Sequence, residues 1–165
     1  MPKAETLLVS TPSETEISIT RVFEAPRALV FRAFTEPALL KRWPLGPDGW
    51  ELAECDVDLR VGGRYRYVWY KAKTGVRMGV SGVFREVVVP ERYVATEKFD
   101  DAWYPGEAVG TLVLTEAGGR TTMTQTLAYE SRAARDVALQ SGMNEGLSAS
   151  YDRLAAVLAA LPGER

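Results

Sequence analysis

Apolar positions in the C-terminal part of the chain repeat with the spacing of an α-helix. Between Ser131 and Leu161 they follow one another at alternating steps of four and three, which places them on one helix face. Ser131 is a suitable N-cap, and Pro162-Gly163 is a suitable stop. The pattern therefore predicts one long, uninterrupted C-terminal helix. Its apolar face consists of Leu139, Met143, Leu147, Ser150, Leu154, Val157 and Leu161.

Small residues interrupt the first half of this apolar face. Gly142, Gly146 and Ser150 alternate there with the bulkier Met143 and Leu147. Each glycine costs about 1 kcal/mol relative to alanine in a helix interior, so a specific role is expected for it. Two interpretations stay open: close packing of the helix on a sheet, or a ligand space beneath its N-terminal half.

The rest of the chain alternates between apolar and polar positions, as β-strands do. Residues 15–23 predict a first strand, and two short helices follow, opened by Pro26 and Pro37. From Trp50 onward, alternating runs are separated by turn residues, which predicts an antiparallel meander. The predicted strands of this meander cover residues 50–59, 64–70, 76–89, 92–99, 107–116 and 120–129.

A sheet of this kind needs a cover for one face, and only the C-terminal helix is long enough to provide it. We therefore predict an α+β fold in which a curved antiparallel sheet of six or seven strands wraps around the long C-terminal helix. Residues 1–14 lack a sustained period and contain two prolines, so a flexible N-terminal lead is expected. Residues 15–162 are expected to form a single domain, as a chain of 165 residues allows.

Composition narrows the range of functions. Hydrophobic residues make up 46% of the chain, charged residues 25%, and the net charge is -2, as in an ordinary soluble protein. Basic side chains are interspersed with acidic ones, so no nucleic-acid partner is expected. No apolar run approaches the roughly 18 residues that span a bilayer, and no signal core is present, so we expect no membrane partner and a cytoplasmic location.

The chain contains no histidine, which restricts its chemistry. Nucleophilic systems of the Ser-His and Cys-His kinds and His-ligated metal sites are excluded. Cys55 is the single cysteine and lies in an alternating strand, which favours a small buried side chain over a reactive thiol. Glu54, Asp56 and Asp58 share one strand face, and we interpret them as a solvated row rather than a cation site. No catalytic residue, metal or cofactor is predicted.

Aromatic residues and methionine are the side chains that a hydrophobic ligand pocket would use. For each candidate, packing in the core is the alternative to ligand binding. Gln125 would be an inward polar group if its face is concave, either as a satisfied core amide or as a ligand contact. The candidate ligand-binding residues are Trp43, Tyr67, Trp69, Met78, Trp103, Gln125, Met143, Gly146 and Leu147.

Four segments carry a resemblance to a known superfamily: ITRVFEAPRALVFRAFTEPALLKRW, DLRVGGRYRY, GVFREVVVPERYVATE and GMNEGLSASYDRLAAVL. In this order they resemble the START-like (Bet v 1-like, SRPBCC) superfamily over residues 15–161. Within it, the chain looks like a small bacterial single-domain member of the family named for the activator of Hsp90 ATPase. The resemblance implies a helix-grip fold with a cavity between sheet and helix, which superfamily members use for lipids, sterols, polyketides and other hydrophobic molecules.

Three functions are compatible with this resemblance. The favoured one is non-enzymatic or weakly enzymatic binding of a small hydrophobic or amphipathic ligand. The second is an enzyme similar to polyketide cyclases or hydrolases, which the lack of histidine disfavours. The third is a co-chaperone module that stimulates an Hsp90-like ATPase. Eukaryotic activators carry an additional N-terminal domain that 14 weakly patterned residues cannot replace, which argues against chaperone contact.

Overall fold

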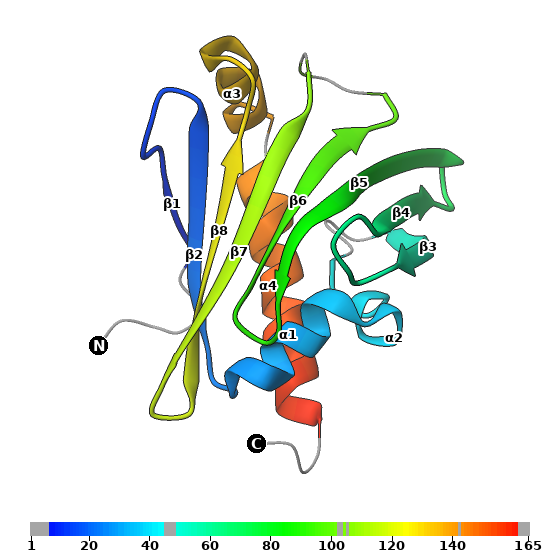
Figure 1. Ribbon diagram of the computed structural model, residues 1–165. Coiled ribbons are helices and arrows are strands. Elements are labelled where there is room, and N and C mark those ends of the chain that lie inside the picture. Colours follow the sequence, from blue (N-terminus) through cyan, green and yellow to red (C-terminus); the bar gives the residue numbers. More distant parts are fainter. Residues whose placement is uncertain (1–6, 45–48, 102–103, 105, 142, 162–165) are drawn as a thin grey trace.

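The structure is a computed structural model that describes residues 7–44, 49–101, 104, 106–141 and 143–161. These residues form one antiparallel sheet and four helices (Figure 1). The strands are β1 (Leu8–Ser10), β2 (Glu16–Phe23), β3 (Trp50–Val57), β4 (Arg64–Lys71), β5 (Val76–Val88), β6 (Arg92–Phe99), β7 (Ala108–Ala117) and β8 (Arg120–Ala128). The helices are α1 (Arg27–Thr35), α2 (Pro37–Leu40), α3 (Arg132–Leu139) and α4 (Met143–Ala160).

The sheet is an antiparallel meander in which β2, the first long strand, pairs with β8, the last strand of the chain. The strand order is β1-β2-β8-β7-β6-β5-β4-β3, and every neighbouring pair is antiparallel. Register irregularities between Leu52 and Glu54 and between Phe84 and Glu86 increase the local twist and curl of the sheet. Helix α4 lies along the concave face, with α1 across one of its ends (Figure 1). The predicted α+β helix-grip architecture is confirmed.

Strand β1 lies within the segment for which we expected a flexible lead. It pairs with the edge of β2, with Leu8 opposite Thr20 and Ser10 opposite Ser18. A strand of three residues is too short to show a period of two in the sequence.

The C-terminal helical segment is divided into α3 and α4, so the prediction of one uninterrupted helix from Ser131 to Leu161 was wrong. Helix α3 ends at Leu139, and the backbone of Gln140 has φ −88° and ψ 0°. The Ser141 hydroxyl donates to the carbonyl of Ala138 at 2.6 Å. Serine side chains that bond the local backbone compete with helical hydrogen bonding. The apolar period continues through this region and therefore hides the break.

The core lies between the concave face of the sheet and α4. Tyr151 of α4 stacks on Trp43 with 5.7 Å between ring centroids and meets the edge of Phe23 at 6.1 Å. Phe34 of α1 packs against Trp43 at 4.9 Å, and Leu154, one turn after Tyr151, is fully buried. Burying a side chain of this size contributes about 1.5–3 kcal/mol. This cluster therefore holds α1, α4 and the sheet together.

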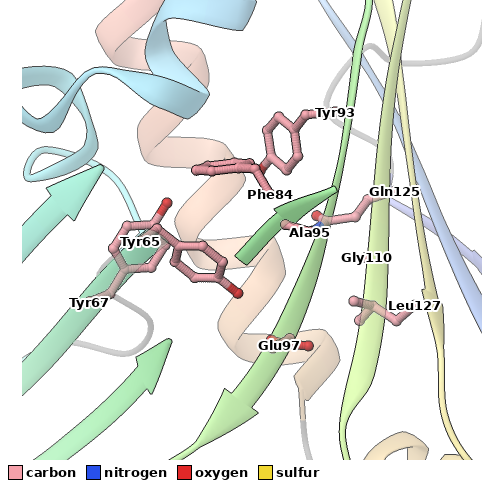
Figure 2. A pocket seen from close by; sticks show the side chains of 9 residues that line it. All are labelled: Tyr65, Tyr67, Phe84, Tyr93, Ala95, Glu97, Gly110, Gln125 and Leu127. Carbon is pink, nitrogen blue, oxygen red and sulfur yellow. The ribbon is translucent and has the colours of Figure 1, made fainter. Parts of the chain in front are cut away.

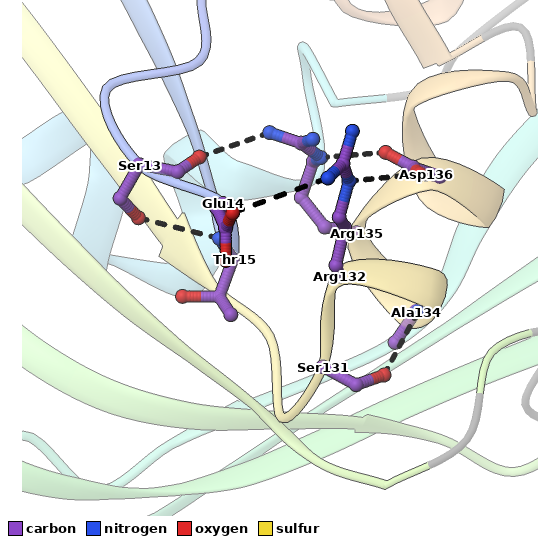
Figure 3. Close-up of polar contacts among 8 residues, drawn as sticks. All are labelled: Ser13, Glu14, Thr15, Ser131, Arg132, Ala134, Arg135 and Asp136. Atoms are coloured by element: carbon purple, nitrogen blue, oxygen red, sulfur yellow. Dashed lines mark hydrogen bonds and ion pairs between the residues drawn. The ribbon is translucent and has the colours of Figure 1, made fainter.

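Polar contacts attach α3 to the segment that precedes β2 (Figure 3). Ser131 caps α3, accepting a hydrogen bond from the backbone N–H of Ala134 at 3.0 Å. The buried guanidinium of Arg135 donates to the Ser13 carbonyl at 2.9 Å and to the Asp136 carboxylate at 2.8 Å. These contacts hold a short helix whose own packing area is small.

Replacing Ser131 with alanine removes the cap of α3. We expect the free energy of unfolding to fall by about 1 kcal/mol and the melting temperature to fall by about 2–4 °C. Urea and thermal denaturation followed by circular dichroism measure both quantities. Ser131→Asp, which keeps an acceptor at the cap, is the control and should recover most of the loss. Equal stability of the alanine variant and the unmodified protein would contradict the assigned capping role.

Candidate functional site

A cavity opens on the concave face of the sheet, the face against which α4 packs. Its volume is about 40 Å³, enough for about three water molecules. Five neighbouring strands line it, and Figure 2 shows their side chains directed into one space. We call it the sheet cavity. Its lining residues are Tyr65, Tyr67, Phe84, Tyr93, Ala95, Glu97, Gly110, Gln125 and Leu127.

The space exists because small residues face each other at the centre of the sheet. Ala95 of β6 is paired with Gly110 of β7, and Gly110 is paired in turn with Leu127 of β8. On β5, a Cβ atom at Gly82 would overlap the Thr96 carbonyl oxygen and the ring of the cross-strand partner Tyr65. Glycine at these positions therefore leaves a hollow at the centre and room for an aromatic ring beside it.

Aromatic rings form one continuous wall of the sheet cavity. Ring centroids are 5.0 Å apart between Tyr65 and Tyr67, 5.7 Å between Tyr65 and Phe84, and 5.5 Å between Phe84 and Tyr93. The Tyr65 hydroxyl donates to the Thr96 carbonyl at 2.7 Å, which fixes that ring. Burial raises the pKa of the three tyrosines above the usual range, so they stay neutral at physiological pH.

Gln125 places an amide in the sheet cavity from β8 (Figure 2). Its Oε1 atom accepts a hydrogen bond from the Tyr151 hydroxyl at 3.0 Å, which sets the orientation of the amide. Among the described residues, no acceptor is found for its Nε2 group. The amide oxygen of Gln125 is thus bonded to Tyr151 of α4, and its amide N–H groups are available to donate to a bound molecule.

Glu97 is the acidic group of the sheet cavity. It comes from β6, where Tyr93, Ala95 and Glu97 share the inward face by the period of two. Desolvation by burial raises the pKa of its carboxyl from the ordinary 4.5 to about 7. Within the described parts of the chain, no lysine or arginine forms an ion pair with it. A carboxyl with a pKa near neutral pH in a cavity is characteristic of functional sites.

Sequence reasoning did not select Glu97. The segment RYVATEKF looks like an ordinary half-exposed strand because two adjacent charged residues, Glu97 and Lys98, lie near its end. The signal that was present is the spacing Tyr93, Ala95, Glu97, which puts the carboxyl on the same face as an aromatic ring. Nothing local in the sequence indicates which face of β6 is concave.

Two of the predicted ligand-binding residues line the sheet cavity: Tyr67 and Gln125. Trp69 lies on the same face as Tyr67, but its indole N–H donates to the Pro44 carbonyl, outside the lining. Trp43 belongs to the core cluster, and its indole N–H donates to the Ala33 carbonyl at 2.8 Å. For both tryptophans, the structure thus identifies partners within the protein.

The other predicted residues lie away from the described lining or outside the described residues. Met78 is exposed on β5, opposite Trp69. Gly146 and Leu147 of α4 are partly buried and are not part of the lining. Met143 begins α4, but its side chain is outside the described residues, and so is Trp103. Ligand contact by these five residues remains a prediction.

Two members of the acidic row, Glu54 of β3 and Asp58 just after it, have basic partners. Glu54 pairs with Arg77 at 3.0 Å, and Asp58 pairs with Arg60 at 2.9 Å. Cys55, on the opposite side of the strand, is buried as predicted, and burial raises the pKa of its thiol to about 11. A protonated, buried thiol is a poor nucleophile. Neither the acidic row nor Cys55 therefore has the properties of a reactive site.

Comparison with known proteins was made for sequence and for structure. The family model described as Activator of Hsp90 ATPase homolog 1-like protein matches residues 24–159. No curated protein sequence matches the chain. In the described parts of the chain, no helix is long and apolar enough to cross a membrane.

Solved structures from three bacteria have a similar fold. A crystal structure from Rhodobacter sphaeroides is 30% identical, with a TM-score of 0.88, over 94% of this chain and 99% of that one. One from Chromobacterium violaceum is 28% identical, with a TM-score of 0.76, over 88% and 98%. The solution structure of the AHSA1-like protein from Aeromonas hydrophila is 22% identical, with a TM-score of 0.71, over 91% and 99%, and indicates the fold alone.

The raised pKa of Glu97 predicts a pH-dependent stability difference. The folded protein binds the Glu97 proton up to about pH 7, whereas the unfolded chain releases it near pH 4.5, so this group's contribution to stability is lost as pH rises through that window. Glu97→Gln cannot ionise. We therefore expect its stability relative to the unmodified protein to increase between pH 5 and pH 8, measured by urea denaturation at each pH.

Glu51→Gln provides the matched control for this measurement. Glu51 is an exposed carboxylate on β3, so its replacement removes the same charge at the surface. The stability difference for this control should change little over the same pH range. A difference for Glu97→Gln that stays constant from pH 5 to pH 8 would mean that the carboxyl titrates normally.

Proposed function

This chain belongs to the Activator of Hsp90 ATPase homolog 1-like family, and we propose that it binds a small amphipathic molecule in the sheet cavity. The observation that carries the proposal is the combination of an aromatic wall with two polar groups in one hollow beneath the gripped helix. Ligand sites are characteristically apolar clefts with a small number of positioned polar groups. The proposal extends the favoured prediction from the sequence.

The lining provides both parts of an amphipathic site. The rings of Tyr67, Phe84 and Tyr93 offer apolar area, and binding there removes ligand surface from water. Gln125 offers an amide donor, and Glu97 offers a carboxyl group. Since these groups come from β8 and β6, on either side of Gly110, a molecule seated against the glycine would have polar partners on both sides.

The size of the sheet cavity limits what it holds. About 40 Å³ corresponds to about three water molecules, so the space as it stands holds a group of only a few heavy atoms. The ligand is therefore a compact molecule or the end group of a longer one that continues beyond the lining. A ligand enclosed as a whole by the rings in their present positions has to be small.

Gly110→Ala tests the proposal by filling the hollow. The added methyl carbon would stand 3.4 Å from a Leu127 methyl and 3.8 Å from the Ala95 carbonyl oxygen, which are ordinary contacts, so the fold accommodates it. When a bound probe already contacts the walls of the sheet cavity, one added methyl group in the lining weakens its binding free energy by about 1–3 kcal/mol. We expect binding of short amphipathic probes, followed by NMR titration of backbone amides, to weaken about tenfold or more.

Thr124→Val is the control for this experiment. Thr124 lies on β8 between Met123 and Gln125 and points to the opposite face of the sheet. Its substitution adds a methyl group in place of a hydroxyl on that face and does not change the lining of the sheet cavity. Probe affinity should be unchanged in this variant. Unchanged affinity in Gly110→Ala, with amide shifts that do not map to the lining, would place the binding elsewhere and contradict the proposal.

Acid–base catalysis on the bound molecule is a second candidate, favoured by Glu97. A carboxyl whose pKa is about 7 is partly protonated at neutral pH and can both donate and accept a proton. The test is to recover a bound molecule after prolonged incubation and to compare its mass and NMR spectrum with those of the starting compound. Conversion by the unmodified protein and none by Glu97→Gln is expected. Recovery of unchanged compound from the unmodified protein would contradict catalysis.

A further inference from the structure

We propose that the molecule bound in the sheet cavity carries a positively charged nitrogen, which lies against the Glu97 carboxylate and the surrounding aromatic rings. The inference rests on the proposed function, because it specifies the chemical class of the ligand at that same site. Three features of the lining support the inference. They are the negative charge of the Glu97 carboxylate, the absence of a basic partner for it among the described residues, and the aromatic wall.

The first argument concerns charge. Glu97 is the acidic residue among the lining side chains, and none of them is a lysine or arginine. Arg21, a buried arginine on the same face of the sheet, donates to Asp152 of α4 at 2.9 Å. On β6 itself, Arg92 pairs with Glu86 at 2.7 Å. Both of these arginines thus have their own carboxylates, and Glu97 forms an ion pair with neither of them.

The second argument concerns desolvation. A carboxylate held away from water without a partner is costly, and a neutral or anionic ligand that displaces the remaining water makes it more so. A ligand with a cationic nitrogen on an apolar chain meets both requirements: the nitrogen compensates the carboxylate charge, and the chain fills the hollow. Among ligands of equal size, the lining therefore favours an ammonium group over a hydroxyl or a carboxylate.

The third argument concerns the rings. The faces of aromatic rings carry negative electrostatic potential and attract cations that lie within about 6 Å of the ring centroid. Tyr65, Tyr67, Phe84 and Tyr93 form an unbroken series with 5.0–5.7 Å between successive centroids. A charged nitrogen near Glu97 thus meets rings as well as the carboxylate, whereas an anion is repelled by both.

The groups around Glu97 determine how binding depends on pH. They are Tyr65 of β4, Tyr93 of β6, Tyr104 and Glu107 before β7, Tyr129 after β8 and Tyr151 of α4. None of these carries a positive charge that would compensate the Glu97 carboxylate. A bound cation lowers the pKa of that carboxyl. Its affinity should therefore increase between pH 5.5 and pH 8, with release of a proton on binding.

The experiment uses three probes of similar size that differ in charge: n-butylammonium, n-butanol and n-butyrate. Each is titrated at pH 8 into the unmodified protein, Glu97→Gln and the surface control Glu51→Gln, and followed by backbone amide shifts. In the unmodified protein and in Glu51→Gln, we expect n-butylammonium to bind at least about tenfold more tightly than the other two. In Glu97→Gln that preference is lost, while the n-butanol affinity stays within about threefold.

A second readout does not depend on the stability of the variant. The carboxyl ¹³C signal of Glu97 in the unmodified protein reports its pKa directly. Saturating n-butylammonium should lower that pKa, and n-butanol should not. Equal affinity for n-butanol and n-butylammonium, or a preference for n-butyrate, would overturn the cation inference while leaving the cavity as a binding site. Failure of all three probes to shift the lining amides would contradict the proposed function as well.

Discussion

The packing of α4 against the concave face of the sheet is the contact on which the rest of the structure depends. An antiparallel sheet with one apolar face is unstable until that face is covered. Tyr151 is the centre of the contact, since it stacks on Trp43 and meets Phe23, and it is almost completely buried. The curl of the sheet, aided by its two register irregularities, brings strands from both edges toward this one helix.

The same packing defines the sheet cavity. The helix covers the sheet fully where the inward residues are large, and it leaves a hollow where Ala95 and Gly110 face each other. Tyr151 belongs to both regions, because its ring is part of the core while its hydroxyl holds the amide of Gln125. Any molecule that displaces the Gln125 amide therefore also acts on the core, and binding and stability are coupled through this residue.

The sequence predicted the features that depend on local physics. Strand ends coincide with turn residues, as at Gly62 and Gly75, where positive φ angles of 84° and 74° favour glycine. The division of the C-terminal helical segment was missed because the apolar period continues across it, while α3 ends at Leu139 and a turn at Gln140 and Ser141 follows. Strand β1 was missed because its three residues are too few to show an alternating pattern.

The candidate site was predictable only in part, because membership of the site depends on which strand faces meet. Tyr67 was found through its aromatic strand pattern, and Gln125 through its position between apolar neighbours. Trp43 has the same composition signal, yet it packs against Tyr151 in the core. Glu97 lies two strands before Gln125 along the chain, and its partial burial depends on how the strands assemble against the helix. No local pattern contains that information.

Glu97 destabilises the folded protein at its position, and ligand binding gives a reason for its presence there. An alanine or leucine at this position would fit an apolar hollow without the desolvation that shifts the carboxyl toward its neutral form. The surrounding tyrosines are neutral and do not compensate a negative charge. The fold thus carries an electrostatic cost at the sheet cavity, where empty space lies beside an aromatic wall. A cation that binds there compensates the desolvated carboxylate. The free energy by which Glu97 destabilises the folded protein is then partly regained on binding, and only a cationic ligand regains it.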